Sequence, residues 1–266
     1  MGNSVFTPLP SSLLRSVDAY WADLLECSLD TLRAGHAVTG IRSASPAVVA
    51  LRRFEQWVIT TSAEVARRVD LEQLRGMLNR VPNDGTQDWV LLDFLAKSGL
   101  MDVYGPAKVS YVTPYAFTPL DVPPGLFRRL TTDDMADFEA FAEGMGGHLD
   151  YRIGDPRFPY VIGAYMDGTL ASVGAVQIWN DLLAETYGDT LPSYRGRGLA
   201  GALVSELTRW ILDETPYIPQ EDGLRANQAS MRIGKRLGYI EYGTLLMTNL
   251  SLHLDQIPGI LQSLEA

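Results

Sequence analysis

The stretch YRGRGLAG, residues 194–201, decides the fold, because two different phosphate-binding patterns overlap in it. It contains G-x-G-x-x-G, which is typical of dinucleotide-binding loops. It also contains R-x-x-G-x-A, a pattern that suits the pyrophosphate of an acyl-coenzyme A. The first pattern favours a dehydrogenase and the second an acyltransferase.

The surroundings of this loop argue against a dinucleotide. Such a loop directly follows a buried strand and has an acidic residue about 20 positions later, at the end of a parallel strand. Here the turn LPSYR precedes Gly196, and the later position falls in residues 216–219, where Pro216 and Pro219 disfavour a central parallel strand. A nucleotide P-loop is excluded too, because Ala202-Leu203 replaces Lys-Ser or Lys-Thr. We expect no NAD or FAD.

The pattern R-x-x-G-x-A fits its surroundings. It stands directly before residues 199–214, whose apolar residues recur at helical spacing. Small residues let backbone N–H groups converge on a pyrophosphate at a helix N-terminus, where the dipole favours anions. Arg195 and Arg197 add positive charge. The same glycines also suit a plain strand-to-helix turn, so this loop alone leaves both interpretations open.

A second segment, ANQASMRIGKRLGYIEYG at residues 226–243, adds N-x-x-S followed by L-G-Y. Together the two segments resemble the core motifs of the GNAT superfamily of acyl-CoA-dependent N-acyltransferases. The run T-L-P-S-Y-R-G-R-G-L-A and the later N-Q-A-S are similar to the glycine N-acyltransferase-like branch. The resemblance covers residues 126–248, nearly half of the chain, and indicates the fold rather than the substrate.

The expected elements agree with this resemblance. From residue 126 onward we expect the order β-α-β-β-β-α-(β)-α-β, with a hairpin turn at Asp167-Gly168. The expected strands are 126–130, 160–166, 170–179, 182–190 and 239–250, and the helices are 131–143, 199–214 and 227–237. Before this part we expect a helix at 13–32, strands at 48–51, 57–60 and 108–112, and helices at 62–69, 71–79 and 88–97.

Four prolines in residues 113–125 mark a domain boundary, because proline breaks helices and central strands alike. We expect residues 1–120 to form an N-terminal α/β domain without a recognised catalytic motif, whose element content permits a degenerate GNAT-like domain. Residues 121–266 would form the GNAT domain. The expected fold class is α/β, with a mixed, mostly antiparallel sheet flanked by helices.

The resemblance implies which residues hold the donor, acetyl-CoA. The backbone of the loop would cradle the pyrophosphate, and the strand before it would offer backbone groups to the pantetheine arm. Asn227 and Ser230 would lie near the cofactor, although both also suit helix capping. The implied cofactor-binding residues are Thr190, Leu191, Arg195, Gly196, Arg197, Gly198, Leu199, Ala200, Gly201, Asn227 and Ser230.

The resemblance also suggests catalytic and substrate-binding residues. Glu185 stands on the strand where GNAT domains often place a base, provided that no bulge turns it away, and Asp189 is a second candidate. Many GNAT enzymes carry a tyrosine acid seven residues after the motif asparagine, but here that position is Gly234. Tyr239 is an aromatic position that normally packs in the core. Candidate substrate contacts are His148, Tyr151, Arg152 and Trp179.

Charge and composition narrow the partners. The net charge of −10 disfavours nucleic acids and anionic membranes. The single cysteine, Cys27, excludes a disulfide within the chain and a cysteine-rich metal site, and no metal is expected. No apolar run is long enough to span a membrane, so we expect a cytoplasmic protein.

The expected reaction transfers an acetyl group to the primary amine of a small molecule, such as an amino acid, a polyamine or an antibiotic. The amine would attack directly in a ternary complex. A protein or peptide N-acetyltransferase and a non-catalytic acyl-CoA-binding module stay open as alternatives, and so does a homodimer.

Overall fold

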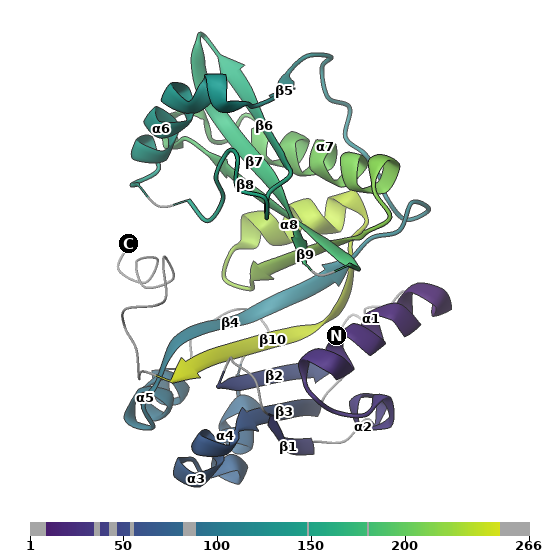
Figure 1. Ribbon diagram of the computed structural model, residues 1–266, viewed down its shortest axis with the longest axis vertical. Helices are drawn as coiled ribbons and strands as arrows, with labels where there is room; N and C mark the ends of the chain where they lie inside the picture. The colour runs from purple at the N-terminus through teal and green to yellow at the C-terminus, as the bar shows by residue number, and fades with distance from the viewer. Residues whose placement is uncertain are drawn as a thin grey trace, which may run out of the picture. The chain divides into compact units, whose positions relative to one another are not determined.

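The computed structural model describes residues 9–34, 38–42, 47–53, 56–81, 89–147, 149–179 and 181–250. The chain divides into two compact units, and each combines segments that are distant in sequence (Figure 1). Unit 1 consists of Met1–Val109, Asp222–Gln228 and Ile240–Ala266, and unit 2 of Ser110–Glu221 and Ala229–Tyr239. No helix of the described residues is long and apolar enough to cross a bilayer.

Unit 1 differs from the predicted N-terminal domain because it includes the last strand of the chain. Residues Thr244–Thr248 of that strand pair antiparallel with Val48–Arg52, so their backbone hydrogen bonds lie in unit 1. The elements of unit 1 are α1 (Ser11–Leu24), α2 (Leu29–Arg33), β1 (Val38–Arg42), β2 (Val48–Arg53), β3 (Gln56–Ser62), α3 (Ala63–Arg68), α4 (Leu71–Leu78), α5 (Trp89–Lys97), most of β4 (Leu100–Tyr111), and β10 (Ile240–Leu250).

Local chemistry explains where the helices of unit 1 begin. The single helix expected at residues 13–32 is two helices, because the Ser28 side chain accepts a hydrogen bond from Thr31 N–H and starts α2.

The strand order begins β1-β3-β2-β10, with β1 parallel to β3 and β2 antiparallel to β3. Helices α3, α4 and α5 pack their apolar residues onto β2 and β3, around the fully buried Trp57.

Unit 2 has the predicted element order as far as its last helix, and the strand predicted after that helix is β10 of unit 1. Strands β5 to β8 are consecutive antiparallel neighbours, and β8 pairs in parallel with β9. The elements are β5 (Phe127–Arg129), η1 (Thr132–Asp134), α6 (Met135–Gly144), β6 (Tyr160–Met166), β7 (Thr169–Trp179), β8 (Leu183–Thr190), η2 (Pro192–Tyr194), α7 (Leu199–Glu214), β9 (Ile218–Leu224, as far as Glu221) and α8 (Gln228–Leu237, from Ala229). The mixed, mostly antiparallel sheet flanked by helices is therefore confirmed.

The two faces of this sheet carry different helices. Phe138 and Phe141 of α6 pack with Val173 and Ala175 of β7. The next residue of β7 after Ala175, Val176, packs with α7 through a cluster that includes Leu203, Leu207 and Ile211. Because side chains alternate along a strand, α6 and α7 cover opposite faces.

One argument from the sequence is wrong. Pro216 and Pro219 were expected to disfavour a central parallel strand, yet β9 begins at Ile218 and pairs in parallel with β8. Proline is tolerated near the start of a strand. The Pro219 carbonyl still accepts a hydrogen bond from Val112 N–H, so the residue keeps one of its backbone bonds.

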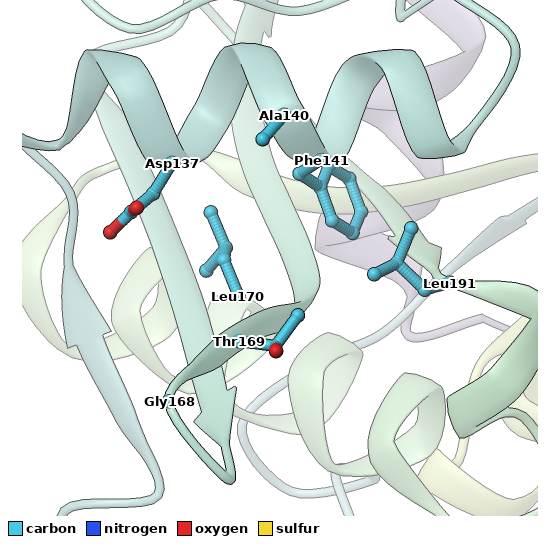
Figure 2. A pocket seen from close by; sticks show the side chains of 7 residues that line it. All are labelled: Asp137, Ala140, Phe141, Gly168, Thr169, Leu170 and Leu191. Carbon is cyan, nitrogen blue, oxygen red and sulfur yellow. The ribbon is translucent and has the colours of Figure 1, made fainter.

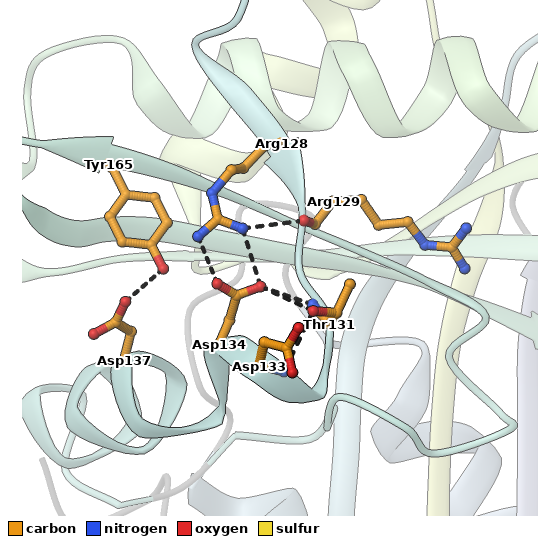
Figure 3. A network of polar contacts seen from close by, with 7 residues as sticks. All are labelled: Arg128, Arg129, Thr131, Asp133, Asp134, Asp137 and Tyr165. Carbon is orange, nitrogen blue, oxygen red and sulfur yellow. Dashed lines mark hydrogen bonds and ion pairs between the residues drawn. The ribbon is translucent and has the colours of Figure 1, made fainter.

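A polar network fixes the start of α6 against β5 and β6 (Figure 3). The Arg128 guanidinium donates two hydrogen bonds to Asp134, at 3.0 and 2.5 Å. Asp134 also accepts a bond from Thr131 N–H and completes a capping box, as the predicted helix start at Thr131 requires. Arg128 lies 4.6 Å from the centre of the Tyr165 ring, whose hydroxyl donates to Asp137.

This network generates a stability prediction. The hydrogen bonds from Arg128 and from Thr131 N–H lower the pKa of Asp134 to about 2. Because a lowered carboxyl pKa stabilises the folded state above the unfolded-state pKa of about 4, we expect Asp134→Asn to reduce the free energy of unfolding at pH 7 by about 1 kcal/mol. The difference should shrink as the pH falls from about 4 towards 2.

Urea denaturation of the native protein and of Asp134→Asn across this pH range measures the effect. The matched control is Asp133→Asn, in the same turn, which should change the free energy of unfolding by less than about 0.5 kcal/mol. Equal effects of the two substitutions at pH 7 would contradict the role given to Asp134.

Candidate functional site

Strands β8 and β9 of unit 2 pair over only three residue positions. The parallel register is Leu183↔Ile218, Ala184↔Pro219 and Glu185↔Gln220, and no pair follows it in the described strands. On its other side β8 pairs with β7 along its whole length, from Trp179↔Leu183 to Ser172↔Thr190. The second half of β8 therefore has a sheet neighbour on one side only.

Alternation along β8 indicates which backbone groups face the unpaired side. Leu191 N–H donates to Ala171 O, so odd-numbered residues direct their backbone groups towards β7. Gly188 and Thr190 then direct theirs to the opposite edge. The Thr190 carbonyl is used there, because it accepts a 3.1 Å hydrogen bond from Arg195 Nε. Gly188 is exposed at this edge. Gly188 was not predicted from the sequence as a cofactor-binding residue.

The loop after β8 has the conformation of an anion-binding turn. Gly196 and Gly198 have φ angles of +77° and +83°, values that favour glycine. Gly198 is the N-cap of α7 and provides no capping side chain, and the first turn contains no acidic residue. The first N–H groups of α7 therefore lack intrahelical acceptors and face the helix N-terminus.

Three further residues of this segment shape the start of α7. Leu199 is buried in a small apolar cluster with Ala164 and Ala171, which holds the first turn against the sheet. A Cβ at Gly201 would come 3.3 Å from the Leu120 side chain, so the absence of a side chain allows close packing. Ala200, between them, is only partly buried.

The two arginines of the loop are exposed and locally anchored. Arg195 donates from Nε to the Thr190 carbonyl, and the residue is exposed. Arg197 lies 4.9 Å from the centre of the Tyr194 ring and donates a long 3.4 Å bond to the Ser193 carbonyl. Both guanidinium groups therefore stand beside the glycine turn, where a phosphate would meet them.

The second motif divides between the units. Asn227 lies in unit 1 and is exposed, and its N–H donates to the Leu224 carbonyl. Ser230 lies in unit 2, where its hydroxyl hydrogen-bonds to Glu221 Oε1 at 3.1 Å. The structure thus gives Ser230 a carboxylate partner that the sequence did not reveal.

Glu185 is the last residue of β8 that pairs with β9, and it is 6% exposed. The register from Gln177↔Glu185 to Ser172↔Thr190 contains no bulge, so Glu185 keeps the orientation that strand alternation gives it. Trp179 Nε1 donates a 2.7 Å hydrogen bond to Glu185 Oε2, and Tyr187 lies 3.4 Å from the same oxygen. Trp179 itself is 40% exposed, so a carboxylate and an accessible aromatic ring stand together.

Asp189 and Tyr151 form a second pair on the α6 side of the sheet. Tyr151 is 1% exposed and packs edge-on against Phe138 and Phe158. Its hydroxyl lies 3.1 Å from both Asp189 Oδ2 and the Val173 carbonyl. Burial raises the pKa of Asp189, and burial raises that of Tyr151 well above its usual value. The structure places Tyr151 in the core rather than at a surface, and the exposed Arg152 follows it.

A pocket of about 220 Å³ lies between α6 and the β6–β7 turn (Figure 2). Leu191, which follows β8, lines one side, and it is the only residue of the predicted site that does so within the described chain. Asp137 and Thr169 provide polar groups, and Ala140, Phe141, Gly168 and Leu170 complete the lining. The predicted substrate residue His148 lies outside the described residues.

The strand directions in the sheet are stronger evidence against a dinucleotide-binding fold than the prolines are. Strand β8, helix α7 and strand β9 do form one parallel unit, but every strand pair from β5 to β8 is antiparallel. A dinucleotide fold requires a doubly wound parallel sheet. Glu221, about 20 residues after the loop as that motif requires, is buried and bonded to Ser230.

Comparisons with known proteins give structural matches only. No protein-family model matches the sequence, and no curated protein matches it. The chain is similar to a GCN5-related N-acetyltransferase from Kribbella flavida (19% identity, TM-score 0.46, 62% of this chain and 65% of that chain). It is also similar to a GNAT-family acetyltransferase from Colwellia psychrerythraea (14% identity, TM-score 0.43, 62% of this chain and 63% of that chain). A GCN5-related N-acetyltransferase-like protein from Streptococcus suis aligns at 18% identity (TM-score 0.42, 76% and 84%). The chain spans less than two thirds of the first two proteins.

The positive φ at the N-cap of α7 generates a second stability prediction. A Cβ at Gly198 would meet no atom within 4 Å, so the only penalty of Gly198→Ala is backbone strain, about 1–2 kcal/mol. Gly76 in α4 has equally open space but a helical φ. We therefore expect Gly76→Ala to stabilise the protein by about 0.5–1 kcal/mol. Chemical denaturation of both variants measures the contrast, and stabilisation by Gly198→Ala would contradict the assigned loop conformation.

Proposed function

We propose that unit 2 is an acyl-CoA-dependent N-acyltransferase domain of the GNAT type. Acetyl-CoA is the proposed donor, and the primary amine of a small molecule is the proposed acceptor. The observation that carries this proposal is the edge of β8, which loses its partner after Glu185 and leads directly into the glycine turn before α7.

This edge suits an acyl-CoA chemically. The pantetheine arm of coenzyme A contains two amide groups, and an unpaired strand edge offers N–H and C=O groups at the spacing that amides bind. Gly188 has no Cβ to obstruct such an approach. The pyrophosphate would then lie at the N-terminus of α7, with Arg195 and Arg197 as its positive partners.

The acceptor end of the site is proposed to lie around Glu185. A carboxylate beside an exposed indole ring suits an ammonium group, which is attracted both by the negative charge and by the face of the ring. Glu185 would take the proton of the attacking amine, through water because the side chain is buried. Trp179 and Tyr187 hold one of its oxygens and so orient the carboxylate.

Ligand-induced changes in melting temperature test the donor. Acetyl-CoA at 100 times its dissociation constant should add about 2.7 kcal/mol of stability, which raises the melting temperature by roughly 5–10 °C. NAD should give no shift. Arg195→Ala should weaken acetyl-CoA binding about tenfold by removing a phosphate partner, equivalent to about 1.4 kcal/mol. The matched control is Arg209→Ala, an arginine of α7 that pairs with Glu206. A shift with NAD alone would overturn the proposal.

Release of free thiol from acetyl-CoA in the presence of a panel of amines tests the reaction. Polyamines, amino acids and aminoglycosides should support release, whereas a basic peptide as the only productive acceptor would favour a peptide N-acetyltransferase. With the best amine, Glu185→Gln should lower kcat by about 10²–10⁴-fold because the general base is lost. Glu206→Gln, a substitution of a half-buried glutamate on α7 that pairs with Arg209, should leave kcat unchanged. Unchanged kcat in Glu185→Gln would exclude Glu185 as the base.

A further inference from the structure

Glu221 is a buried carboxylate at the point where β8 and β9 stop pairing. It directly follows Gln220, the last residue of β9 paired with β8, and it is 5% exposed. The Ser230 hydroxyl of α8 lies 3.1 Å from its Oε1 atom. A buried carboxyl group is costly to keep, so its position at this junction calls for an explanation.

The carboxylate of Glu221 fills the space over Gly234. A Cβ added at Gly234 would overlap both oxygens of Glu221, so only glycine fits at this position of α8. Gly234 is also the position at which the GNAT pattern has its tyrosine acid. An acidic group is therefore present at this point, but β9 supplies it instead of α8.

A second buried polar group shares the face of Glu221. The Tyr111 hydroxyl hydrogen-bonds to Gln220 Oε1 at 2.9 Å, so these two side chains lie on one face of the sheet. Side chains alternate along each strand, which places Ser110 and Glu221 together on the other face. Ser110 is fully buried, and its Oγ atom has no hydrogen-bond partner in the described part of the chain. Most buried hydroxyl groups in folded proteins have a hydrogen-bond partner, so this one is unusual.

Tyr239 places another buried hydroxyl group on the α7 side of the sheet. Its hydroxyl lies 2.8 Å from Thr208 Oγ1 of α7 and is buried, as the sequence predicted for this aromatic position. Burial raises the pKa of Tyr239. Because Glu185 is in register with Gln220, Glu185 and Glu221 point to opposite faces of the sheet at the place where β8 and β9 stop pairing.

We propose that Glu221, in its protonated form, is the acid that donates a proton to the departing sulfur, an inference that rests on the proposed acyltransferase function. In this step the amine nitrogen forms a bond to the thioester carbonyl carbon. The carbon–sulfur bond breaks, its electron pair goes to sulfur, and sulfur takes the proton of Glu221. Glu185 accepts the proton that the amine loses, and Glu221 regains a proton from solvent.

The test compares Glu221→Gln with the native enzyme, using acetyl-CoA and the amine that gives the fastest thiol release. Glu221→Gln keeps the shape but has no acidic proton, so kcat should fall about 100-fold, within the range for loss of an acid. The dissociation constant for acetyl-CoA should change less than about threefold, because glutamine still accepts a bond from Ser230. Glu221→Asp should retain part of the activity.

Infrared difference spectroscopy on acetyl-CoA binding gives a readout that does not depend on turnover. The native protein should show the carbonyl stretch of a protonated carboxyl group that shifts on binding. The band should be absent in Glu221→Gln and retained in Glu185→Gln.

The outcomes separate the two proposals. A native protein that neither binds acetyl-CoA nor releases thiol overturns the acyltransferase function itself. A native protein that binds and reacts, while Glu221→Gln matches its kcat or keeps the same carboxyl band, overturns only the role of Glu221. Melting curves of both variants test whether they are folded. If Glu221→Gln is unfolded, the infrared spectrum of Glu221→Asp decides instead. Absence of the protonated carboxyl band from that spectrum would contradict the role of Glu221 as the acid.

Discussion

The candidate site depends on one constraint of strand pairing, namely that β8 loses its neighbour β9 after Glu185. Backbone N–H and C=O groups require partners, so an edge in the middle of a sheet is stable only if something else satisfies it. Within the chain, Arg195 does so for the Thr190 carbonyl. A ligand that carries amide groups would do so for the rest, which is why we place the pantetheine arm there.

The carboxylates at the two sides of this gap have different surroundings. Glu185 on β8 is oriented by an indole N–H and lies beside an exposed ring. Glu221 on β9 is enclosed by α8, where Gly234 leaves it room and Ser230 lies within hydrogen-bonding distance. Two acids in unlike environments are the usual way for one site to provide both a base and an acid. The absence of a tyrosine at Gly234 is thereby compatible with catalysis.

Much of unit 2 could be predicted from sequence because its signals are local. The apolar stripe of α7, the capping residues Thr131 and Asp134, and the Asp167-Gly168 turn each determine their own element. The errors came from non-local effects. Strand β9 tolerates Pro219 because of its place in the sheet, and Tyr151 is buried by aromatic residues that are distant in sequence. That Glu221 fills the space over Gly234 follows only from the packing of α8 on β9. The last strand, β10, belongs to unit 1 because its backbone hydrogen-bond partners lie in β2.

The measurement that tests the central claim most directly is amide hydrogen exchange of the protein with and without acetyl-CoA. The account predicts protection of the Gly188 and Thr190 amides at the open edge of β8, and of the amides from Gly196 to Gly201 at the start of α7, with ATP as a control that protects only the second group. Acetyl-CoA binding that leaves both segments unprotected and protects other amides would contradict the account.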